Sequence, residues 1–256
     1  MLRKIKIEIE KLEAEKDIKI IYAVESGSRA WGFASLDSDW DVRFIYVHQY
    51  DWYLSVEEKK DNIEIMLPND IDLSGWELRK ALLLFRKSNP PLLEWLRSPI
   101  KYKEELSLAY DLRDAMKVYF NPKSCMYHYL HMANGNYDAY FKSKTTRLKK
   151  YFYVLRPILA CLWIERTGEM APMEFDYLLK EEIPDGNLKN EINKLLHQKK
   201  NGEELDIGNR IHVIDNFIED KLSYFKNYLI DFNFKNSPGF TELNMLFRKT
   251  LKEAWN

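Results

Sequence analysis

The fold is decided by the stretch IKIIYAVESGSRAWGFASLDSDWDVRFIYVH, residues 18–48. Its two ends, Ile18–Ser26 and Trp40–His48, are rich in isoleucine, valine and aromatic residues and are bounded by turn residues. That composition is typical of β-strands. The sequence between them, GSRAWGFASLDSD (residues 27–39), is rich in Gly, Ser and Asp and predicts a loop with one helical turn. The stretch therefore predicts two strands joined by a long polar loop.

Two more strands and a helix are predicted around this stretch, within residues 1–75. The strands are expected over Asn62–Pro68 and Asp70–Gly75, where apolar and polar residues alternate. Beyond Gly75 the apolar residues recur at helical spacing, and Asn89–Pro91 should stop the first helix because proline cannot continue one. Further helices are predicted over Tyr127–Phe141, Thr145–Arg166, Leu222–Leu229 and Thr241–Trp255, with a solvated turn over His197–Asp206.

This order of elements predicts an α+β protein. A small mixed β-sheet of four or five strands should occupy residues 1–105, and a helical bundle should occupy residues 106–256. The length of 256 residues suits either one large domain or two domains of ordinary size.

The composition excludes several classes of protein. A hydrophobic content of 46% is that of a globular chain rather than a disordered one. The 39 Lys and Arg residues against 40 Asp and Glu residues leave a net charge of −1, which excludes a uniformly basic nucleic-acid coat but allows a local basic groove. The two cysteines, Cys125 and Cys161, cannot form a disulfide scaffold or a four-cysteine zinc cluster.

The sequence also argues against a membrane protein. The N-terminal residues 1–16 alternate charged and apolar residues and lack the apolar core of a signal peptide. The longest apolar stretch near the middle, Ile158–Ile164, is far too short to span a bilayer. We therefore expect a soluble, cytoplasmic protein without a membrane partner.

The loop contains the residues with the clearest chemical meaning. Asp39 and Asp41 are two apart at the start of a strand, so their carboxylates should lie side by side on one face. Such a pair is hard to keep ionised without a cation, and hard oxygen ligands suit Mg²⁺ or Mn²⁺. Gly27 and Ser28 offer a small residue, a backbone N–H and a hydroxyl, which allow a phosphate to approach closely. The alternative is a polar loop entering a half-buried strand.

In this order, Gly27-Ser28, Asp39-Trp40-Asp41 and Ile71-Asp72-Leu73 resemble the motif of the DNA polymerase β-like nucleotidyltransferase superfamily. Three longer phrases narrow the resemblance to the YcgL/RlaP branch of predicted nucleotidyltransferases, some of which are associated with RNA repair. These phrases are SGSRAWGFASLDSDWDVRFIYV, DLSGWELRKALLLFRKSNPPLLEWLRSPIKY and KKYFYVLRPILACLWIE. The similarity extends over residues 18–175.

The resemblance implies a palm-like catalytic domain that uses two Mg²⁺ or Mn²⁺ ions. Asp39 and Asp41 would hold the ion that binds the triphosphate, and Asp72 would join them in holding the ion that activates the acceptor oxygen. Ser28 would contact the β- and γ-phosphates, and Gly27 would allow their approach. The helical domain would close the nucleotide cleft.

The third acid has two alternatives to Asp72. Glu64 also lies in a β-like run between apolar neighbours, and Asp70 shares the face of Asp72 if that strand is regular. Asp72 is preferred because it matches the acid that precedes the Gly-Trp-x-Leu-Arg-Lys helix in the branch. Asp37 is expected to turn the loop rather than to bind metal.

Several basic residues could contact the nucleotide. Arg29 could reach a phosphate or pair with the nearby acids of the loop, and Arg43 could reach a phosphate or neutralise those acids. Residues 139–164 contain no Asp or Glu, so Lys149 and Arg156 would create a local positive field, with Tyr153 available for stacking on a base. The alternative for these residues is a solvated basic face beside a core helix.

The predicted activity is transfer of a nucleoside monophosphate from an NTP, with ATP as the expected donor, to a hydroxyl acceptor and release of pyrophosphate. The acceptor could be an RNA end, a protein side chain or a small molecule, and RNA is preferred because of the branch's association with repair. The alternative is a non-catalytic nucleotide- or RNA-binding protein that retains the fold. A phosphodiester-cleaving or polymer-forming variant is a third possibility.

Overall fold

The computed structural model describes residues 1–202, 205, 207–233 and 238–256. The contacts within it divide the chain into two compact units. We call residues 1–30, 39–119 and the C-terminal helix the sheet unit, and residues 31–38 together with the helices between residues 120 and 233 the helical unit. This division differs from the predicted boundary after residue 105, because the helix over residues 108–119 and the C-terminal helix pack in the sheet unit.

The sheet unit is built on a five-stranded mixed sheet in the order β3-β4-β2-β1-β5. β2 and β4 are parallel, and the other neighbouring strands are antiparallel. The predicted α+β class is confirmed. The elements of this unit are α1 (Leu2–Lys16), β1 (Ile18–Glu25), α2 (Gly27–Ala30), β2 (Trp40–His48), α3 (Tyr50–Tyr53), β3 (Asn62–Leu67), β4 (Ile71–Glu77), α4 (Leu78–Arg86), α5 (Pro90–Arg97), β5 (Lys101–Glu104), α6 (Leu108–Tyr119) and α12 (Thr241–Trp255).

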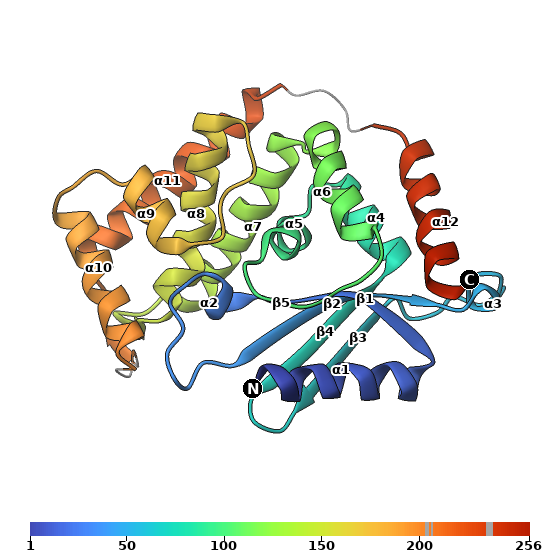
Figure 1. The fold of residues 1–256 in the computed structure, drawn as a ribbon. Helices are drawn as coiled ribbons and strands as arrows, with labels where there is room; N and C mark the ends of the chain where they lie inside the picture. Colours follow the sequence, from blue (N-terminus) through green and yellow to red (C-terminus); the bar gives the residue numbers. More distant parts are fainter. Residues whose placement is uncertain (203–204, 206, 234–237) are drawn as a thin grey trace. The chain divides into compact units, whose positions relative to one another are not determined.

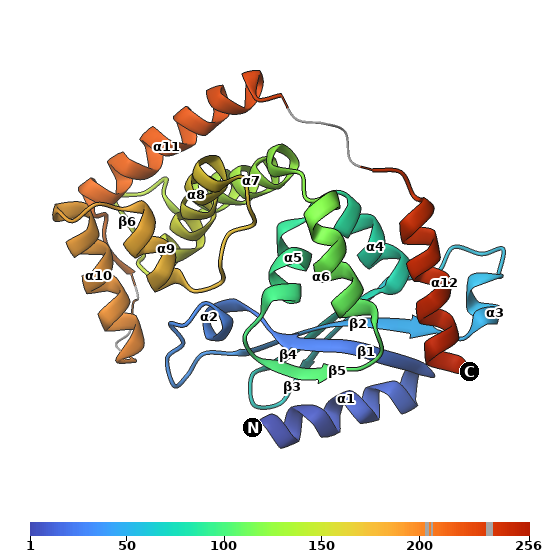
Figure 2. The same ribbon diagram turned by 45° about the horizontal axis from the view of Figure 1, so that its top comes forward.

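Helices cover both faces of this sheet. α1 lies along one face, and α4, α5 and α6 lie on the other (Figures 1 and 2). The residues of α1 that face the sheet, Ile5, Ile9 and Leu12, recur at helical spacing and are at most 3% exposed. They pack in one core with Val42 of β2 and Leu73 of β4. Because side chains alternate along a strand, the neighbours of Val42 and Leu73 point to the opposite face.

Polar residues define where the helices of the sheet unit begin. Glu77 caps α4, since its carboxylate accepts the backbone N–H groups of Arg79 and Lys80 at 2.7 and 3.4 Å. Asn89 caps α5 by accepting the N–H of Leu92 at 3.3 Å, and the two prolines that follow stand in its first turn. The predicted stop at Asn89–Pro91 is confirmed, since α4 has ended before these residues and α5 starts within them.

Two predicted segments of the helical unit form a different structure, and the helix predicted over Leu222–Leu229 is part of a longer one over His212–Asp231. The helix predicted over Thr145–Arg166 begins at Lys150, because Thr145–Arg147 form a strand that pairs with Ile207–Asn209. Two consecutive β-branched threonines favour that extended pairing. The turn predicted over His197–Asp206 is helical as far as Lys200, and its residues 203–204 and 206 lie outside the described residues. The elements of this unit are α7 (Pro122–Tyr140), β6 (Thr145–Arg147), α8 (Lys150–Thr167), α9 (Phe175–Glu182), α10 (Asn187–Lys200), β7 (Ile207–Asn209) and α11 (His212–Asp231).

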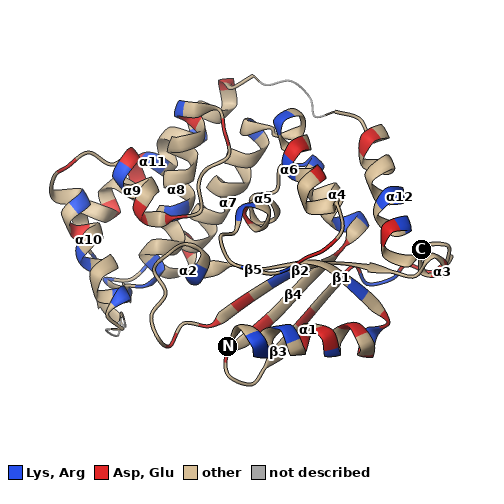
Figure 3. Cartoon of the chain, viewed as in Figure 1, with Lys and Arg blue, Asp and Glu red and all other residues tan. Residues whose placement is uncertain are grey.

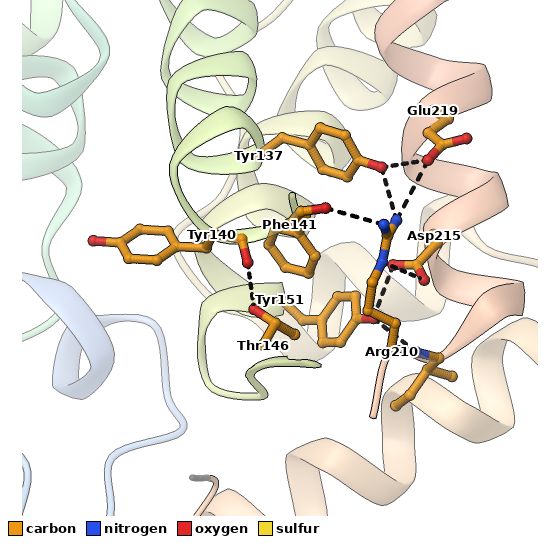
Figure 4. Close-up of polar contacts among 9 residues, drawn as sticks. Tyr137, Tyr140, Phe141, Thr146, Tyr151, Arg210, Asp215 and Glu219 are labelled. Atoms are coloured by element: carbon orange, nitrogen blue, oxygen red, sulfur yellow. Dashed lines mark hydrogen bonds and ion pairs between the residues drawn. The ribbon is translucent and has the colours of Figure 1, made fainter. Parts of the chain in front are cut away.

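A polar network ties the paired strands β6 and β7 to the helices of this unit (Figure 4). The guanidinium of Arg210 donates to the Asp215 carboxylate at 3.0 Å, the Phe141 carbonyl at 3.0 Å and the Tyr137 hydroxyl at 2.9 Å. Tyr151 donates to the other oxygen of the Asp215 carboxylate at 2.8 Å. The carboxylate of Asp215 is buried, so this ion pair and its hydrogen bonds replace the water that it loses on folding.

Charges of both signs are interspersed along the helices of both units, in keeping with the balanced composition (Figure 3). Among the described residues, no helix combines the length and the apolar character that crossing a membrane requires.

Candidate active site

The Gly27-Ser28 turn directly follows β1 and forms the short helix α2. Gly27 has a φ of +58°, a conformation that favours glycine. A Cβ at this position would lie 2.1 Å from Oδ2 of Asp41, so the backbone of the turn packs directly against that carboxylate. The N–H of Ser26 donates to the Asp41 carbonyl at 2.8 Å and holds the turn beside β2. The predicted phosphate turn and one predicted metal ligand are therefore neighbours.

Asp41 and Asp72 are register partners on the parallel strands β2 and β4. Both side chains point to the sheet face opposite α1, because Val42 and Leu73 pack against that helix. One nitrogen, Nη2 of Arg43, donates to Oδ1 of Asp41 at 2.9 Å and to Oδ2 of Asp72 at 2.8 Å. The two carboxylates thus converge on a single positive group. Of the two roles considered for Arg43, the contacts favour neutralisation of the acids.

Burial raises the pKa of the Asp41 carboxyl, and the charge of Arg43 opposes that rise. A divalent cation fits this pair chemically, since the donors are hard carboxylate oxygens that already share one cation. In the described part of the chain, however, no group of three or more Asp, Glu, His or Cys side chains is arranged to hold a metal ion. The third carboxylate of the predicted set is therefore not arranged with this pair to hold an ion.

Asp39 is the candidate for that third carboxylate, and its side chain is exposed. Its backbone carbonyl accepts a hydrogen bond from Nε of Arg29 at 3.0 Å, and the same guanidinium lies 3.7 Å from the centre of the Trp40 ring. Arg29 therefore fastens together the two ends of the loop. Asp37 is exposed, and a hydrogen bond with Ser35 lowers the pKa of its carboxyl.

The geometry separates the three acids considered near β4. Asp72 stands beside Asp41, as described above. Asp70 precedes the strand with a φ of +56°, so it is not part of a regular strand that would carry its side chain onto the same face. Glu64 is exposed on β3 and pairs with Ser74 rather than with Asp72. Asp72 is the one of these three that shares a cation with Asp41.

A buried carboxylate beneath the site was not anticipated from the sequence. Glu25, at the end of β1, accepts the backbone N–H of Asp41 at 2.9 Å and a short hydrogen bond from the hydroxyl of Tyr102. Burial raises the pKa of Glu25 to about 7. A glutamate at the end of a mostly apolar strand is the available signal, but its partner Tyr102 lies 77 residues away in the sequence.

The three residues predicted to contact the nucleotide at or near the start of α8 differ in exposure. Lys149 is exposed, and Tyr153 is 40% exposed beside the ring of Trp31, with centroids 6.0 Å apart. The side chain of Arg156 is instead 1% exposed, and it donates to the carbonyl of Pro172 at 3.3 Å. Its guanidinium also lies 5.0 Å from the centre of the Trp31 ring. These contacts give Arg156 a structural part in the helical unit.

Comparisons with known proteins show which family the chain resembles. The family model described as RlaP, an RNA repair pathway DNA polymerase beta family, matches residues 1–249. The chain is 47% identical to the protein YcgL of Bacillus subtilis (strain 168), which is described as uncharacterized, over 255 residues that cover 100% of this chain and 98% of that protein. It is also similar to the crystal structure of a nucleotidyltransferase-like protein from Exiguobacterium sibiricum 255-15. That match has 13% identity and a TM-score of 0.31, and it covers 96% of this chain and 89% of the other.

Proposed function

Because the chain belongs to the RlaP family, we propose that it is a metal-dependent nucleotidyltransferase. It would transfer a nucleoside monophosphate from an NTP, with ATP as the expected donor, to a hydroxyl group. The family's description as an RNA repair pathway family supports an RNA end as the acceptor. The proposal is carried by one observation. Asp41 and Asp72 both pair with the guanidinium of Arg43 on one face of the sheet, directly beside the Gly27-Ser28 turn.

The reaction places few demands on the protein besides position and charge. The acceptor oxygen forms a bond to the α-phosphorus, the bond from that phosphorus to the β-phosphate oxygen breaks, and pyrophosphate leaves as the hydroxyl proton is lost. Asp41 and Asp72, together with Asp39, would hold Mg²⁺ or Mn²⁺, which neutralises charge on the triphosphate when bound. The hydroxyl of Ser28 and the backbone of Gly27 would bind the terminal phosphates. Lys149 and Tyr153 are candidate contacts to the nucleotide.

The test is transfer of label from each α-labelled NTP in the presence of Mg²⁺ or Mn²⁺. RNA with a free 3′ hydroxyl, RNA with a blocked 3′ end, and cell-extract protein would be offered as separate acceptors. We expect label on the RNA with the free end and none on the blocked RNA. Asp41→Asn and Asp72→Asn should each abolish transfer, whereas Asp70→Asn, the neighbouring acid outside the pair, should retain it. Transfer that survives in both Asp41→Asn and Asp72→Asn would refute the assignment.

One observation favours a second candidate, non-catalytic binding of a nucleotide or RNA. Arg43 already neutralises Asp41 and Asp72, and such a pair is stable without a metal ion. A titration with Mn²⁺ separates the two candidates. Saturable binding that Asp41→Asn removes supports the enzyme. Binding of nucleotide or RNA that neither needs Mn²⁺ nor changes in Asp41→Asn supports the binding protein.

A further inference from the structure

A buried glutamate lies next to the acid pair but takes no part in the proposed reaction. Glu25 is the last residue of β1, just before the phosphate turn, and it is fully buried. Glutamate is rarely buried unless it is paired or hydrogen-bonded, so its partners indicate what it does. Its contacts with Asp41, Ser98 and Tyr102 all lie within the sheet unit.

The backbone N–H of Asp41 points toward β1 at a place where that strand has ended. In a central strand, the N–H groups of successive residues bond to opposite neighbours. The N–H of Trp40 donates to the Asp70 carbonyl at 2.7 Å on the β4 side, so the N–H of Asp41 faces the β1 side. The chain turns away at Gly27, and Oε1 of Glu25 accepts the N–H of Asp41 at 2.9 Å. The side chain of Glu25 therefore takes the place of a backbone carbonyl at the end of the ladder.

Both polar backbone groups of Asp41 are held by consecutive residues at the end of β1. Glu25 accepts the N–H of Asp41, and the N–H of Ser26 donates to the Asp41 carbonyl at 2.8 Å. These two bonds fix the point from which the Asp41 carboxylate projects toward Arg43 and Asp72. The position of the acid pair therefore depends on the end of β1 as well as on β2 and β4.

Glu25 is itself held at each of its polar groups. Oε2 accepts a hydrogen bond from the hydroxyl of Tyr102 on β5, and Tyr102 is 4% exposed. The backbone carbonyl of Glu25 accepts the hydroxyl of Ser98 at 2.6 Å, and its N–H donates to the Ile100 carbonyl at 2.9 Å. A fully bonded buried network of this kind is rigid, so Glu25 offers Asp41 an acceptor at a fixed place.

We infer that Glu25 is a positioning residue that holds the Asp41 carboxylate in the acid pair through the Asp41 backbone. The inference rests on the proposed function where it concerns metal binding. Replacing a group that holds a metal ligand in place changes metal affinity by about tenfold to a hundredfold. Glu25 acts through the reach of its oxygen rather than through its charge, since its bond to Asp41 is to a neutral backbone N–H.

Two conservative variants separate reach from charge. Glu25→Gln keeps an acceptor oxygen at the same distance and removes the charge, and its amide can donate to the Tyr102 hydroxyl. Glu25→Asp keeps the charge but is one methylene shorter, so its oxygen falls short of the Asp41 N–H. Mn²⁺ affinity is measured on the full chain by electron paramagnetic resonance. We expect Glu25→Gln to bind within about twofold of the wild type and Glu25→Asp to bind about tenfold more weakly.

Glu77 provides a matched control in the same unit. It is 1% exposed and accepts the backbone N–H of Arg79 at 2.7 Å and the hydroxyl of Tyr53 at 2.6 Å. It lies at the other end of β4 from Asp72. Glu77→Asp should lose stability in urea as Glu25→Asp does, yet bind Mn²⁺ like the wild type. Equal weakening in these two variants would overturn the inference, as would unchanged affinity in Glu25→Asp or equal weakening in Glu25→Gln and Glu25→Asp.

Hydrogen exchange at the Ser26 amide, followed by nuclear magnetic resonance, gives a readout that needs no metal. This amide donates to the Asp41 carbonyl, so it reports a displacement of the Asp41 backbone. Exchange should be faster in Glu25→Asp than in Glu77→Asp, and equal exchange would overturn the inference. If the wild type binds no Mn²⁺, the metal site of the proposed function fails, and this exchange decides the inference alone.

A second pair of variants serves if Glu25→Asp does not fold. Tyr102→Phe removes the hydroxyl that holds Glu25, and Tyr53→Phe is its control because the Tyr53 hydroxyl holds Glu77 in the same way. Tyr102→Phe should weaken Mn²⁺ binding and speed exchange at Ser26, whereas Tyr53→Phe should leave both unchanged. Equal results in the two variants would overturn the inference.

Discussion

Gly27 lies so close to Asp41 that a side chain at position 27 would displace the Asp41 carboxylate. A Cβ on Gly27 would lie 2.1 Å from Oδ2 and 2.9 Å from Cγ of Asp41. Distances below 3 Å between such atoms force one of the groups to move. The neighbouring carboxylate therefore favours glycine at this position, as does its own φ of +58°. This contact links the two halves of the motif physically.

Gly27→Ala should weaken metal binding more than it weakens the fold. The strain of an alanine at positive φ costs about 1 kcal/mol, but the added methyl group must also displace the Asp41 carboxylate. Gly168→Ala is the matched control, because Gly168 has a φ of +71° and nothing within 4 Å of the added methyl group. Gly27→Ala should lose at least as much stability in urea as Gly168→Ala, and Gly27→Ala alone should weaken Mn²⁺ binding, by about tenfold if returning the carboxylate to the ion costs about 1.4 kcal/mol. Equal Mn²⁺ affinities in the two variants would show that the contact is immaterial.

Arg43→Gln should tighten Mn²⁺ binding. In the wild type a cation bound between Asp41 and Asp72 has to displace the guanidinium, which holds both carboxylates at 2.8–2.9 Å. Without that competitor the acids repel each other and gain more from a metal ion. The same variant should be less stable than the wild type in chelator and should regain stability as Mn²⁺ is added, because a ligand that binds only the folded state stabilises it.

Isothermal titration with Mn²⁺ and thermal unfolding with and without chelator measure both effects of Arg43→Gln. Arg86→Gln is the control, since Arg86 contacts the Pro238 carbonyl and the Phe240 ring in the same unit rather than the acids. Weaker Mn²⁺ binding in Arg43→Gln would mean that the guanidinium supports the metal site instead of competing for it.

His48→Phe should reduce the stability that the protein loses in mild acid. Burial lowers the pKa of His48 to about 4, and its ring stacks on Trp52 with centroids 4.1 Å apart. In the unfolded chain the histidine has a pKa of about 6.5 and binds a proton below that pH. In the folded chain His48 binds the proton only below about pH 4. His48 therefore lowers stability as the pH falls through this window. Urea unfolding at pH 7.5 and pH 5 should show a smaller difference in His48→Phe, and identical pH dependence in both proteins would contradict the argument.

The sequence predicts which residues form this site better than it predicts which residues they contact. Strand alternation and the order of motifs are local properties, so the strands that carry Asp41 and Asp72 could be located in advance. The parallel pairing of β2 with β4 sets those acids side by side. The long connection between the two strands carries no local pattern that predicts this pairing. Arg43 could likewise be placed on the acid face by its spacing, whereas its choice between a phosphate and the acids depends on both strands at once.

Long-range packing explains what could not be predicted. Phe33 lies in a polar, glycine- and serine-rich segment that looks like a solvated loop, yet its partners Phe152 and Phe175 come from a different part of the chain. The C-terminal helix was predicted with its observed bounds, Thr241–Trp255. Its place beside the sheet depends on contacts such as the indole N–H of Trp255 donating to the His48 carbonyl at 2.8 Å, 207 residues away. Helical periodicity gives a face to be buried but not the surface that buries it.

Asp215→Ala should destabilise the helical unit strongly. The Asp215 side chain is 4% exposed and pairs with Nε of Arg210 at 3.0 Å, so its removal leaves that Nε and the hydroxyl of Tyr151 without this acceptor. Breaking a buried pair from one side costs about 3 kcal/mol. Asp220→Ala, on the same helix, is the control, because the Asp220 side chain is 68% exposed in its pair with Lys221 and such surface pairs contribute about 0.5 kcal/mol or less. In urea, Asp215→Ala should lower the free energy of unfolding by about 3 kcal/mol and Asp220→Ala by about 0.5 kcal/mol or less. Similar losses in the two variants would show that the Arg210 network contributes no more than a surface ion pair.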